Sequence, residues 1–471
     1  MRIRTPAGRL PLELVESDAR LEVFVEGAPL DGIAPVERTR AGVYAGLRTL
    51  ASKLLERDMH VEACASCLRF RFSGMSHDMS SGSQGYCTLV GFRNPKALVS
   101  ITHACGEFEA AVGFPDDDEA TTTARIEAEN RPPRLLAFQG CIVGLAVGDA
   151  LGFPCEFRTR AQILAAFGPS GVTDFVGILD AAWPKWPAIL SRPHPPGTFS
   201  DDTQMSIALA EGLLDGERGN LDIVMQRVAA RFVAWSHADN NNRAPGNACM
   251  TGCTNVERGM PWSVAGVADS KGCGAAMRVA PIGLLYADDH ERLLEVARAS
   301  ALITHRHDAG IEGAAAAALL VALALSKRTP EQMYDALVKE CAPRSKDFAA
   351  CLERFAKHCD SPPEIALSKE GIGEGWVAEE AVLSALYCLW QRPDDFAAAV
   401  LLGANTDGDS DSIACIAGSI AGALHGVEAI PPKWRSTVED AGELFGVAER
   451  LLEAAYEDAK APESRGRLQS Q

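Results

Sequence analysis

The chain has 471 residues, of which 47% are hydrophobic and 23% charged, the balance of a globular protein. This length exceeds a single core of ordinary size and predicts two domains. The formal net charge is -18, which argues against broad electrostatic binding to nucleic acid or to anionic membranes. We therefore expect neither of these as a partner.

No export signal is visible, because the opening MRIRTPAGRLPLELVE lacks an apolar core followed by a small-residue cleavage site. The most apolar run, GAAAAALLVALAL at 313–325, is shorter than the roughly 20 residues that span a bilayer, and it predicts a buried helix. The 14 cysteines then indicate reduced thiols or metal ligands rather than disulfides. These features lead us to expect a cytoplasmic protein.

Residues 1–130 are expected to form a small α+β domain that contains cysteines. ARLEVFVEGAPLDG and CTLVGFRN are strand-like, whereas AGVYAGLRTLASKLLERD is helix-like. The four cysteines that open with Cys-x-x-Cys are typical of a small metal-binding module, with Zn²⁺ our first choice and an iron–sulfur cluster the second. The alternatives are a ligand from His77 or His103, or thiols that bind no metal. The four cysteines are Cys64, Cys67, Cys87 and Cys105.

The composition changes near residues 115–135, where GFPDDDEATTTARIEAENRPPR is acidic and ends in two prolines. From there the pattern is almost wholly helical. Ala, Leu and Gly dominate the apolar runs, and small residues at helical spacing allow helices to pack closely. The sequence therefore predicts a mainly α protein, with an all-α domain at 131–460 and a disordered tail at 461–471.

A first cluster of polar residues, Ser200, Asp201 and Asp202, stands directly before an apolar run that predicts a helix. A serine or aspartate in this place is commonly an N-cap, and acids in the first turn are favoured by the helix dipole. Adjacent carboxylates also repel each other, at a cost that rises with burial. Taken alone, this cluster is equally well interpreted as a helix cap or as part of a metal site.

A second cluster contains Asp407, Asp409 and Asp411, with Ser412 beside them. The following IACIAGSIAGALHG consists almost entirely of small apolar residues and predicts a deeply buried helix, so its acids are expected in an interior cleft. Buried unpaired carboxylates are costly, and oxygen ligands of this kind suit Mg²⁺, Mn²⁺ or Ca²⁺. Two such clusters facing each other would hold two ions. Asp407 itself is interpreted as a solvated loop charge.

Six motifs, in this order, make the chain resemble the ADP-ribosylglycohydrolase family over roughly residues 136–455. The resemblance implies an all-α fold for this part of the chain. The motifs are GCIVGLAVGDALGFPCEF (140–157), FSDDTQMSIALAEGLL (199–214), RAPGNACMTGC (243–253), SKGCGAAMRVAPIGLLY (270–286), ALITHRHDAG (301–310) and GDSDSIACIAGSIAGALHG (408–426).

The resemblance implies a centre of two Mg²⁺ or Mn²⁺ ions that grips the ribose hydroxyls and orients a water toward the anomeric carbon. Glu156, on a mobile loop, would lie near the ribose and the scissile bond. A glycine-rich turn would offer backbone N–H groups to the diphosphate. The implied metal ligands are Ser200, Asp201, Asp202, Asp409, Asp411 and Ser412. The candidate catalytic residues are Glu156, Asp202 and Asp409. The implied substrate-binding residues are Gly272, Cys273, Gly274 and His305.

The resemblance indicates a metal-dependent hydrolase that removes ADP-ribose from modified protein side chains. Serine stands at positions 200 and 412, where the family commonly has threonine, and the hydroxyl is kept. The DSDS form at 409–412 is similar to that of arginine-directed members, which favours N-glycosidic hydrolysis of ADP-ribosylarginine. The alternatives are ADP-ribosylserine, ADP-ribosylated nucleic acid, or a binding or immunity protein that caps a cognate ADP-ribosyltransferase.

Overall fold

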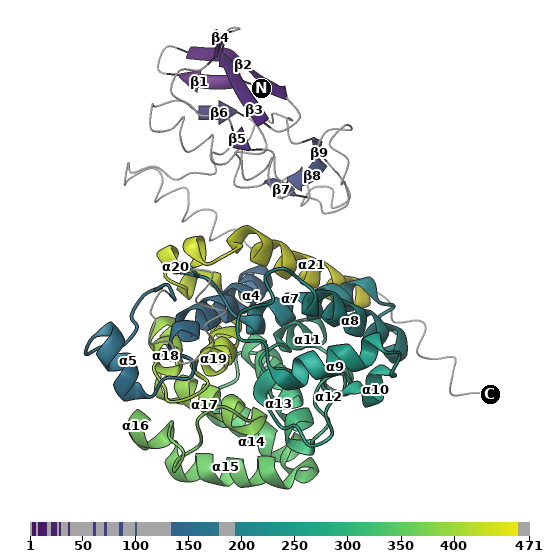
Figure 1. Ribbon diagram of the computed structural model, residues 1–471, viewed down its shortest axis with the longest axis vertical. Coiled ribbons are helices and arrows are strands. Elements are labelled where there is room, and N and C mark those ends of the chain that lie inside the picture. The colour runs from purple at the N-terminus through teal and green to yellow at the C-terminus, as the bar shows by residue number, and fades with distance from the viewer. Residues whose placement is uncertain are drawn as a thin grey trace, which may run out of the picture. The chain divides into compact units, whose positions relative to one another are not determined.

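The computed structural model describes residues 133–178 and 194–459, together with the backbone of nine short strands between residues 2 and 100 (Figure 1). The chain divides into two compact units, residues 1–130 and 131–471. Several sequence predictions lie outside the described residues and stay predictions. They are the helix at 41–58, the tail at 461–471, and the metal site of Cys64, Cys67, Cys87 and Cys105, whose side chains are not described.

The described backbone of the first unit forms two antiparallel sheets. In the larger one the strands run in the order β4–β3–β2–β1–β6, and β5 also pairs with β3. The smaller sheet has the order β7–β8–β9. The strands are β1 (Arg2–Thr5), β2 (Gly8–Glu16), β3 (Arg20–Val25), β4 (Ala28–Pro29), β5 (Val36–Glu37), β6 (His60–Glu62), β7 (Phe70–Phe72), β8 (Gln84–Cys87) and β9 (Val99–Ser100).

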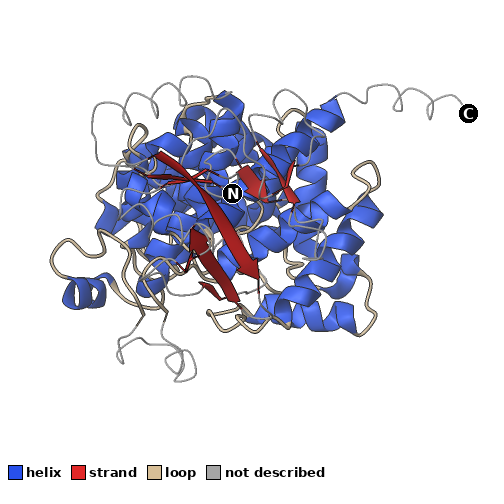
Figure 2. Cartoon of the chain, turned by 90° about the horizontal axis from the view of Figure 1, so that it is seen from above, coloured by secondary structure: helices blue, strands red, loops and turns tan. Residues whose placement is uncertain are grey.

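Within residues 133–178 and 194–459 the chain forms helices and loops and only isolated β-bridges, which confirms the predicted all-α domain (Figure 2). The α-helices are α4 (Pro133–Gly152), α5 (Arg160–Phe167), α7 (Asp201–Asp215), α8 (Leu221–Ser236), α9 (Asn247–Glu257), α10 (Trp262–Ala265), α11 (Ala280–Leu285), α12 (His290–Leu302), α13 (Asp308–Leu325), α14 (Pro330–Glu340), α15 (Lys346–His358), α16 (Pro363–Ala366), α17 (Ala378–Gln391), α18 (Phe396–Ala404), α19 (Ser410–His425), α20 (Pro432–Thr437) and α21 (Ala441–Ala459). The 3₁₀ turns are η3 (Phe153–Cys155), η4 (Cys273–Ala275), η5 (Ala342–Arg344) and η6 (Val427–Ala429).

Two helices, α4 and α13, are apolar on nearly all sides and belong to the core of the domain. A helix without a polar face is stable only when it is buried on every side. By length and composition Pro133–Cys155 and Asp308–Leu325 would suffice to cross a membrane, but 89% and 83% of their apolar windows are buried inside the domain. The apolar run at 313–325 is thus part of a buried core helix, as predicted from its length.

Close packing of α4 against α19 sets the register of the core. Gly140, Gly144 and Gly148 recur every fourth residue and therefore lie along one face of α4. A Cβ atom on Gly148 would lie 2.0 Å from the carbonyl oxygen of Ala414, and one on Gly144 would lie 2.4 Å from that of Gly418. As α4 is followed forward these contacts run backward along α19, so the two helices are antiparallel. The end of α4 consequently lies at the beginning of α19.

Candidate active site

The first predicted cluster lies at the beginning of α7, where an acid from another helix holds it in place. Ser200 is the N-cap of α7, and its Oγ accepts a hydrogen bond of 3.3 Å from the N–H of Asp202. Asp149 of α4 accepts bonds from the N–H of Ser200 at 2.8 Å, from the N–H of Thr203 at 2.9 Å, and from the Thr203 hydroxyl at 2.6 Å. Burial raises the pKa of Asp149 to about 6. The sequence interpretation missed Asp149, although an acid inside an apolar helix was a visible signal.

A short backbone pairing joins the loop after α4 to the loop before α19. The N–H of Phe157 donates to the carbonyl of Gly408 at 3.1 Å, and the N–H of Gly408 donates to the carbonyl of Arg158 at 3.3 Å. The interpretation of Asp407 as a solvated loop charge is wrong, because its Oδ1 accepts a bond of 2.5 Å from the N–H of Arg160, the first residue of α5. A carboxylate at this end of a helix is favoured by the helix dipole. Asp407 therefore stabilises the junction of the two loops.

This junction brings together three buried acids, Glu156, Asp409 and Asp411. Each of them offers one carboxylate oxygen, and these oxygens all lie within 4.8 Å of one another. Oxygen atoms at this separation can bind a single divalent cation. The sequence predicted Glu156 as a catalytic residue only, whereas the structure also groups it with two of the predicted metal ligands.

The electrostatics of the acids favour a bound cation. Burial, followed by repulsion from neighbouring acids, raises the pKa of Asp202 and of Asp411 well above the usual range. Burial also raises the pKa of Asp409. Within the described part of the chain the Oδ2 atom of Asp202, a residue only 2% exposed, has no hydrogen-bond partner. Because a buried carboxylate oxygen without a partner is costly, the residues present fit a site for Mg²⁺ or Mn²⁺.

The acids form one wall of a cavity of about 340 Å³, a volume within the usual range of small-molecule sites. Most of the residues that the sequence singled out meet here. Ser200 is the exception, because it is fully buried as the N-cap of α7 and does not line the cavity. The predicted residues that do line it are Glu156, Asp201, Asp202, Gly272, Cys273, Gly274, His305, Asp409, Asp411 and Ser412.

The predicted glycine-rich turn forms another part of the cavity lining. A Cβ atom on Gly274 would lie 2.7 Å from Sγ of Cys249 and 3.0 Å from Cε1 of His305, so a side chain at this position would displace its neighbours. The thiol of Cys273 donates a hydrogen bond of 2.8 Å to Oδ2 of Asp409. This turn thus contacts the acids of α19 directly, which the sequence did not predict.

Two buried residues that the sequence interpretation missed determine how His305 faces the cavity. The guanidinium of Arg278, a fully buried side chain, donates to the hydroxyl of Thr304 at 2.8 Å. Oγ1 of Thr304 lies 2.8 Å from Nδ1 of His305. A hydroxyl that accepts from Arg278 can donate its own proton to Nδ1, and in that arrangement the proton of the neutral imidazole lies on Nε2. Burial, followed by the charge of Arg278, lowers the pKa of His305 to about 3.

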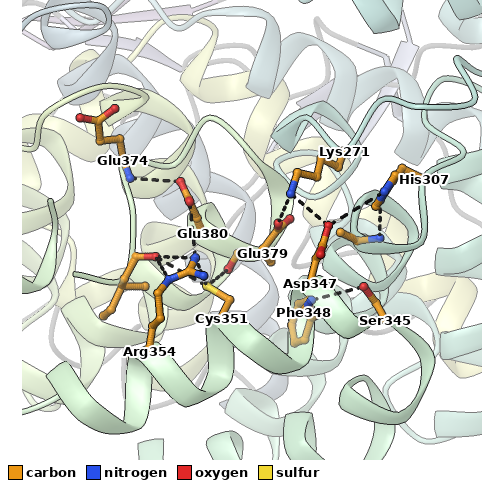
Figure 3. A network of polar contacts seen from close by, with 12 residues as sticks. Lys271, His307, Ser345, Asp347, Phe348, Cys351, Arg354, Glu374, Glu379 and Glu380 are labelled. Atoms are coloured by element: carbon orange, nitrogen blue, oxygen red, sulfur yellow. Dashed lines mark hydrogen bonds and ion pairs between the residues drawn. The ribbon is translucent and has the colours of Figure 1, made fainter. Parts of the chain in front are cut away.

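Helix α17 supports two of the loops that line the cavity (Figure 3). Glu379, in its first turn, accepts a bond of 3.2 Å from the ammonium group of Lys271, which directly precedes the glycine-rich turn. The carboxylate of Glu380 accepts a bond of 3.2 Å from the N–H of Glu374. The carbonyl of Glu374 in turn accepts a bond of 2.9 Å from the N–H of Asp409. Two consecutive glutamates therefore connect α17 to both sides of the cavity.

An aromatic pair lines the cavity next to Glu156. The rings of Phe157 and Trp376 stack with centroids 5.0 Å apart and an interplanar angle of 26°. Phe157 has a φ of 63°, in the left-handed region that a residue with a bulky side chain rarely adopts. The stack and the backbone pairing with Gly408 hold Phe157, and thus the neighbouring Glu156, in this unusual conformation.

An all-α domain whose cavity combines buried carboxylates with a glycine-rich turn belongs to the class of helical proteins whose acids fit a site for a divalent cation. Residues 131–461 match the family model described as ADP-ribosylglycohydrolase. The chain belongs to this family, and the resemblance seen in its six motifs is confirmed. Its membership places it among ADP-ribosyl hydrolases.

Individual relatives agree with this assignment. An uncharacterized protein of Archaeoglobus fulgidus is 32% identical over 320 residues, which cover 67% of this chain and 96% of that protein. The ADP-ribosylarginine hydrolase Tri1 of Serratia proteamaculans is 26% identical, with 70% and 84% covered. The ADP-ribosylhydrolase ARH3 of Gallus gallus is 28% identical, with 69% and 95% covered. A solved structure, an ADP-ribosylglycohydrolase-related protein complex, has a TM-score of 0.54 and 27% identity and covers 68% of this chain and 99% of that one.

Proposed function

We propose that this protein hydrolyses the N-glycosidic bond between ADP-ribose and an arginine side chain of a modified protein. The observation that carries the proposal is the meeting of Glu156, Asp409 and Asp411 in one cavity with the glycine-rich turn. Family membership supports hydrolysis of an ADP-ribosyl bond. The DSDS form at 409–412 and the likeness to two proteins named ADP-ribosylarginine hydrolase support the arginine linkage.

The acids would hold the metal centre. Glu156, Asp409 and Asp411 fit one cation, and a second would be shared with the acids of α7 and with the hydroxyl of Ser412, which line the same cavity. Bound Mg²⁺ or Mn²⁺ supplies Lewis-acid chemistry, which polarises ribose hydroxyls and lowers the pKa of a water. The predicted ligands outside the triad are Ser200, Asp201, Asp202 and Ser412.

The chain's own groups would bind the substrate and move the protons. Nε2–H of His305 and the first N–H groups of η4 would donate to the diphosphate, and the imidazole remains neutral at pH 7 because of its low pKa. As water forms a bond to the anomeric carbon and the bond to the guanidine nitrogen breaks, Asp202 would accept the water's proton. Asp202 would then pass this proton to the departing nitrogen, while Glu156, as a carboxylate of the metal centre, would stabilise the positive charge that develops on the ribose. The transition state is expected to be oxocarbenium-like, as in other glycoside hydrolyses.

The test is release of free ADP-ribose from an ADP-ribosylarginine peptide and an ADP-ribosylserine peptide, side by side, with Mg²⁺, with Mn²⁺ and with EDTA. We expect metal-dependent release from the arginine peptide, and loss of at least about 100-fold in rate in Asp409→Asn. Release from the serine peptide alone would refute the proposed linkage while keeping the chemistry. Full activity of Asp409→Asn would refute the assignment of the metal centre.

A second candidate keeps the site and changes the bond, to O-linked ADP-ribosylserine. It is supported by the comparable likeness, 28% identity, to an ADP-ribosylhydrolase whose name specifies no arginine linkage. ADP-ribosylated nucleic acid and the capping of a cognate ADP-ribosyltransferase are further proposals from the sequence, as is the cytoplasmic location. A stoichiometric complex with a transferase that survives Asp409→Asn would support the capping role.

A further inference from the structure

The cavity places a thiol, that of Cys273, beside the acids that fit a centre for Mg²⁺ or Mn²⁺. Cys273 lines the cavity, and its Sγ lies 2.8 Å from Oδ2 of Asp409. The hydroxyl of Ser412 donates to the same sulfur at 3.6 Å. Mg²⁺ prefers oxygen ligands, whereas sulfur is a ligand for zinc and other soft cations. Because the thiol contacts a carboxylate of the acidic triad, sulfur and oxygen together form a ligand set that suits zinc better than Mg²⁺.

A second observation at the same place also points to a ligand. Asp202 lines the cavity from the α7 side, is 2% exposed, and has an Oδ2 atom without a partner among the described residues. The thiol of Cys273 also lines the cavity and carries the proton that it donates to Asp409. A carboxylate oxygen and a thiol thus approach the same part of the cavity from two sides.

We propose that Cys273 and Asp409, with the neighbouring acids, form a mixed sulfur and oxygen site that binds a thiophilic divalent cation such as Zn²⁺, and that this binding inhibits the enzyme. On binding, the thiol releases its proton to solvent as the sulfur–metal bond forms, with no change of oxidation state. Ligands to one tetrahedral zinc, with bonds of about 2.3 Å to sulfur and about 2.1 Å to oxygen, lie roughly 3.6 Å apart. The observed 2.8 Å separation must open by under about 1 Å, within the reach of a side-chain adjustment.

Inhibition follows from the place of Cys273 in the cavity. A zinc ion closed in by a thiolate and several carboxylates has no open position, unlike a catalytic centre, which keeps one for water or substrate. The same ion would hold Cys273 against α19, where the turn is proposed to meet the diphosphate. This inference rests on the proposed function in one respect, namely that the acidic cluster is the metal centre.

The experiment is a titration of the metal-free full-length protein with Co²⁺, a spectroscopic substitute for zinc, followed through the thiolate-to-cobalt charge-transfer band. Wild type is compared with Cys273→Ser and with Cys249→Ser, a matched control that removes another thiol of the same cavity. Because the N-terminal cysteines can contribute a band of their own, the readout is the difference between each variant and wild type. Circular dichroism confirms that each variant is folded, and Cys273→Ala serves as the second variant at that position.

We expect both Cys273 variants to lose part of the band, Cys249→Ser to keep it, and excess Mg²⁺ to remove the part that depends on Cys273. A wild-type band in both Cys273 variants, or its loss in Cys249→Ser instead, would overturn the assignment. In the second arm, Zn²⁺ is titrated into the Mg²⁺-supported release of ADP-ribose, each variant relative to its own zinc-free rate. The half-inhibiting concentration should rise at least about tenfold in Cys273→Ser, by analogy with the loss of supporting groups at metal sites.

The two proposals fail in distinguishable ways. If no ADP-ribose is released from any substrate but the cobalt band depends on Cys273, the proposed function fails and the metal inference stands. If ADP-ribose is released with Mg²⁺ but zinc inhibits wild type and Cys273→Ser alike, the function stands and the inference on Cys273 is refuted.

Discussion

Replacing Gly148 by alanine tests whether the contact between α4 and α19 sets the geometry of the acids. The added Cβ would lie 2.0 Å from the carbonyl oxygen of Ala414, whereas real Cβ atoms essentially never approach within 3.0 Å. The helices must therefore separate by about 1 Å. Overpacking costs roughly 1–3 kcal/mol, and a clash with backbone belongs at the upper end of that range. Subtracting the gain of up to about 1 kcal/mol from alanine in a helix leaves a net loss near 2 kcal/mol.

The same separation should damage activity, because α4 leads to Glu156 and α19 begins beside Asp409. A displacement of catalytic groups by about 1 Å lowers the reaction rate by on the order of 100-fold. The assay pairs urea unfolding with release of ADP-ribose from whichever peptide the release assay identifies as a substrate. The control is Gly446→Ala in α21, where an added Cβ meets nothing within 4 Å and should stabilise by roughly 0.5–1 kcal/mol. If Gly148→Ala had the same urea midpoint and the same rate of ADP-ribose release as this control, the close contact between α4 and α19 would not be what positions the acids.

Three further predictions follow from the buried polar groups. Without added metal, Asp202→Asn should unfold at pH 8 no more easily than wild type, because the substitution removes a buried acid. With Mn²⁺ at 100 times its Kd, wild type should gain roughly 2.7 kcal/mol in free energy of unfolding, and Asp202→Asn should lose this gain. Equal thermal shifts on adding Mn²⁺ would contradict the prediction. Asp149→Asn should cost about 2 kcal/mol in urea unfolding, since an amide presents a donor to the N–H groups of α7, and an unchanged midpoint would refute the role. His305 has a pKa near 3 when folded against 6.5 when unfolded, so the unfolded chain binds its proton first and stability falls as pH drops below 6.5. In His305→Gln this loss between pH 7.5 and pH 5 should be smaller, and an identical loss would exclude His305 as a cause.

The sequence was sufficient to predict the helical domain and the two acid clusters because these features depend on local sequence, whereas the other predicted cavity residues came from the family resemblance. An apolar run with small residues at helical spacing predicts a buried helix whatever surrounds it, as at 135–152 and 413–426. Acids before such a helix predict an interior cleft. The repeat of glycine every fourth residue in α4 also indicated close helix packing, although not the partner helix.

The sequence could not reveal the roles of residues whose hydrogen-bond partners lie far away along the chain. Asp149 anchors the beginning of α7 because α4 passes the start of that helix, 51 positions along the chain from Ser200. Arg278 and Thr304 matter through a bond that joins residues 26 positions apart and orients His305. Asp407 was misinterpreted for the same reason, since its partner, the N–H of Arg160, is 247 positions away.

The placement of both acid clusters at helix beginnings has a physical consequence for the metal-free protein. Helix dipoles favour carboxylates at the first turns of α7 and α19, but that effect, up to about 2 kcal/mol at best, is smaller than the cost of several buried like charges. The raised pKa of Asp202 and of Asp411 is consistent with burial and repulsion together exceeding the local compensation. The fold therefore holds the acids together against their own repulsion, through the α4–α19 contact and the α17 supports. Cation binding should then stabilise the domain, because the ion offsets this repulsion.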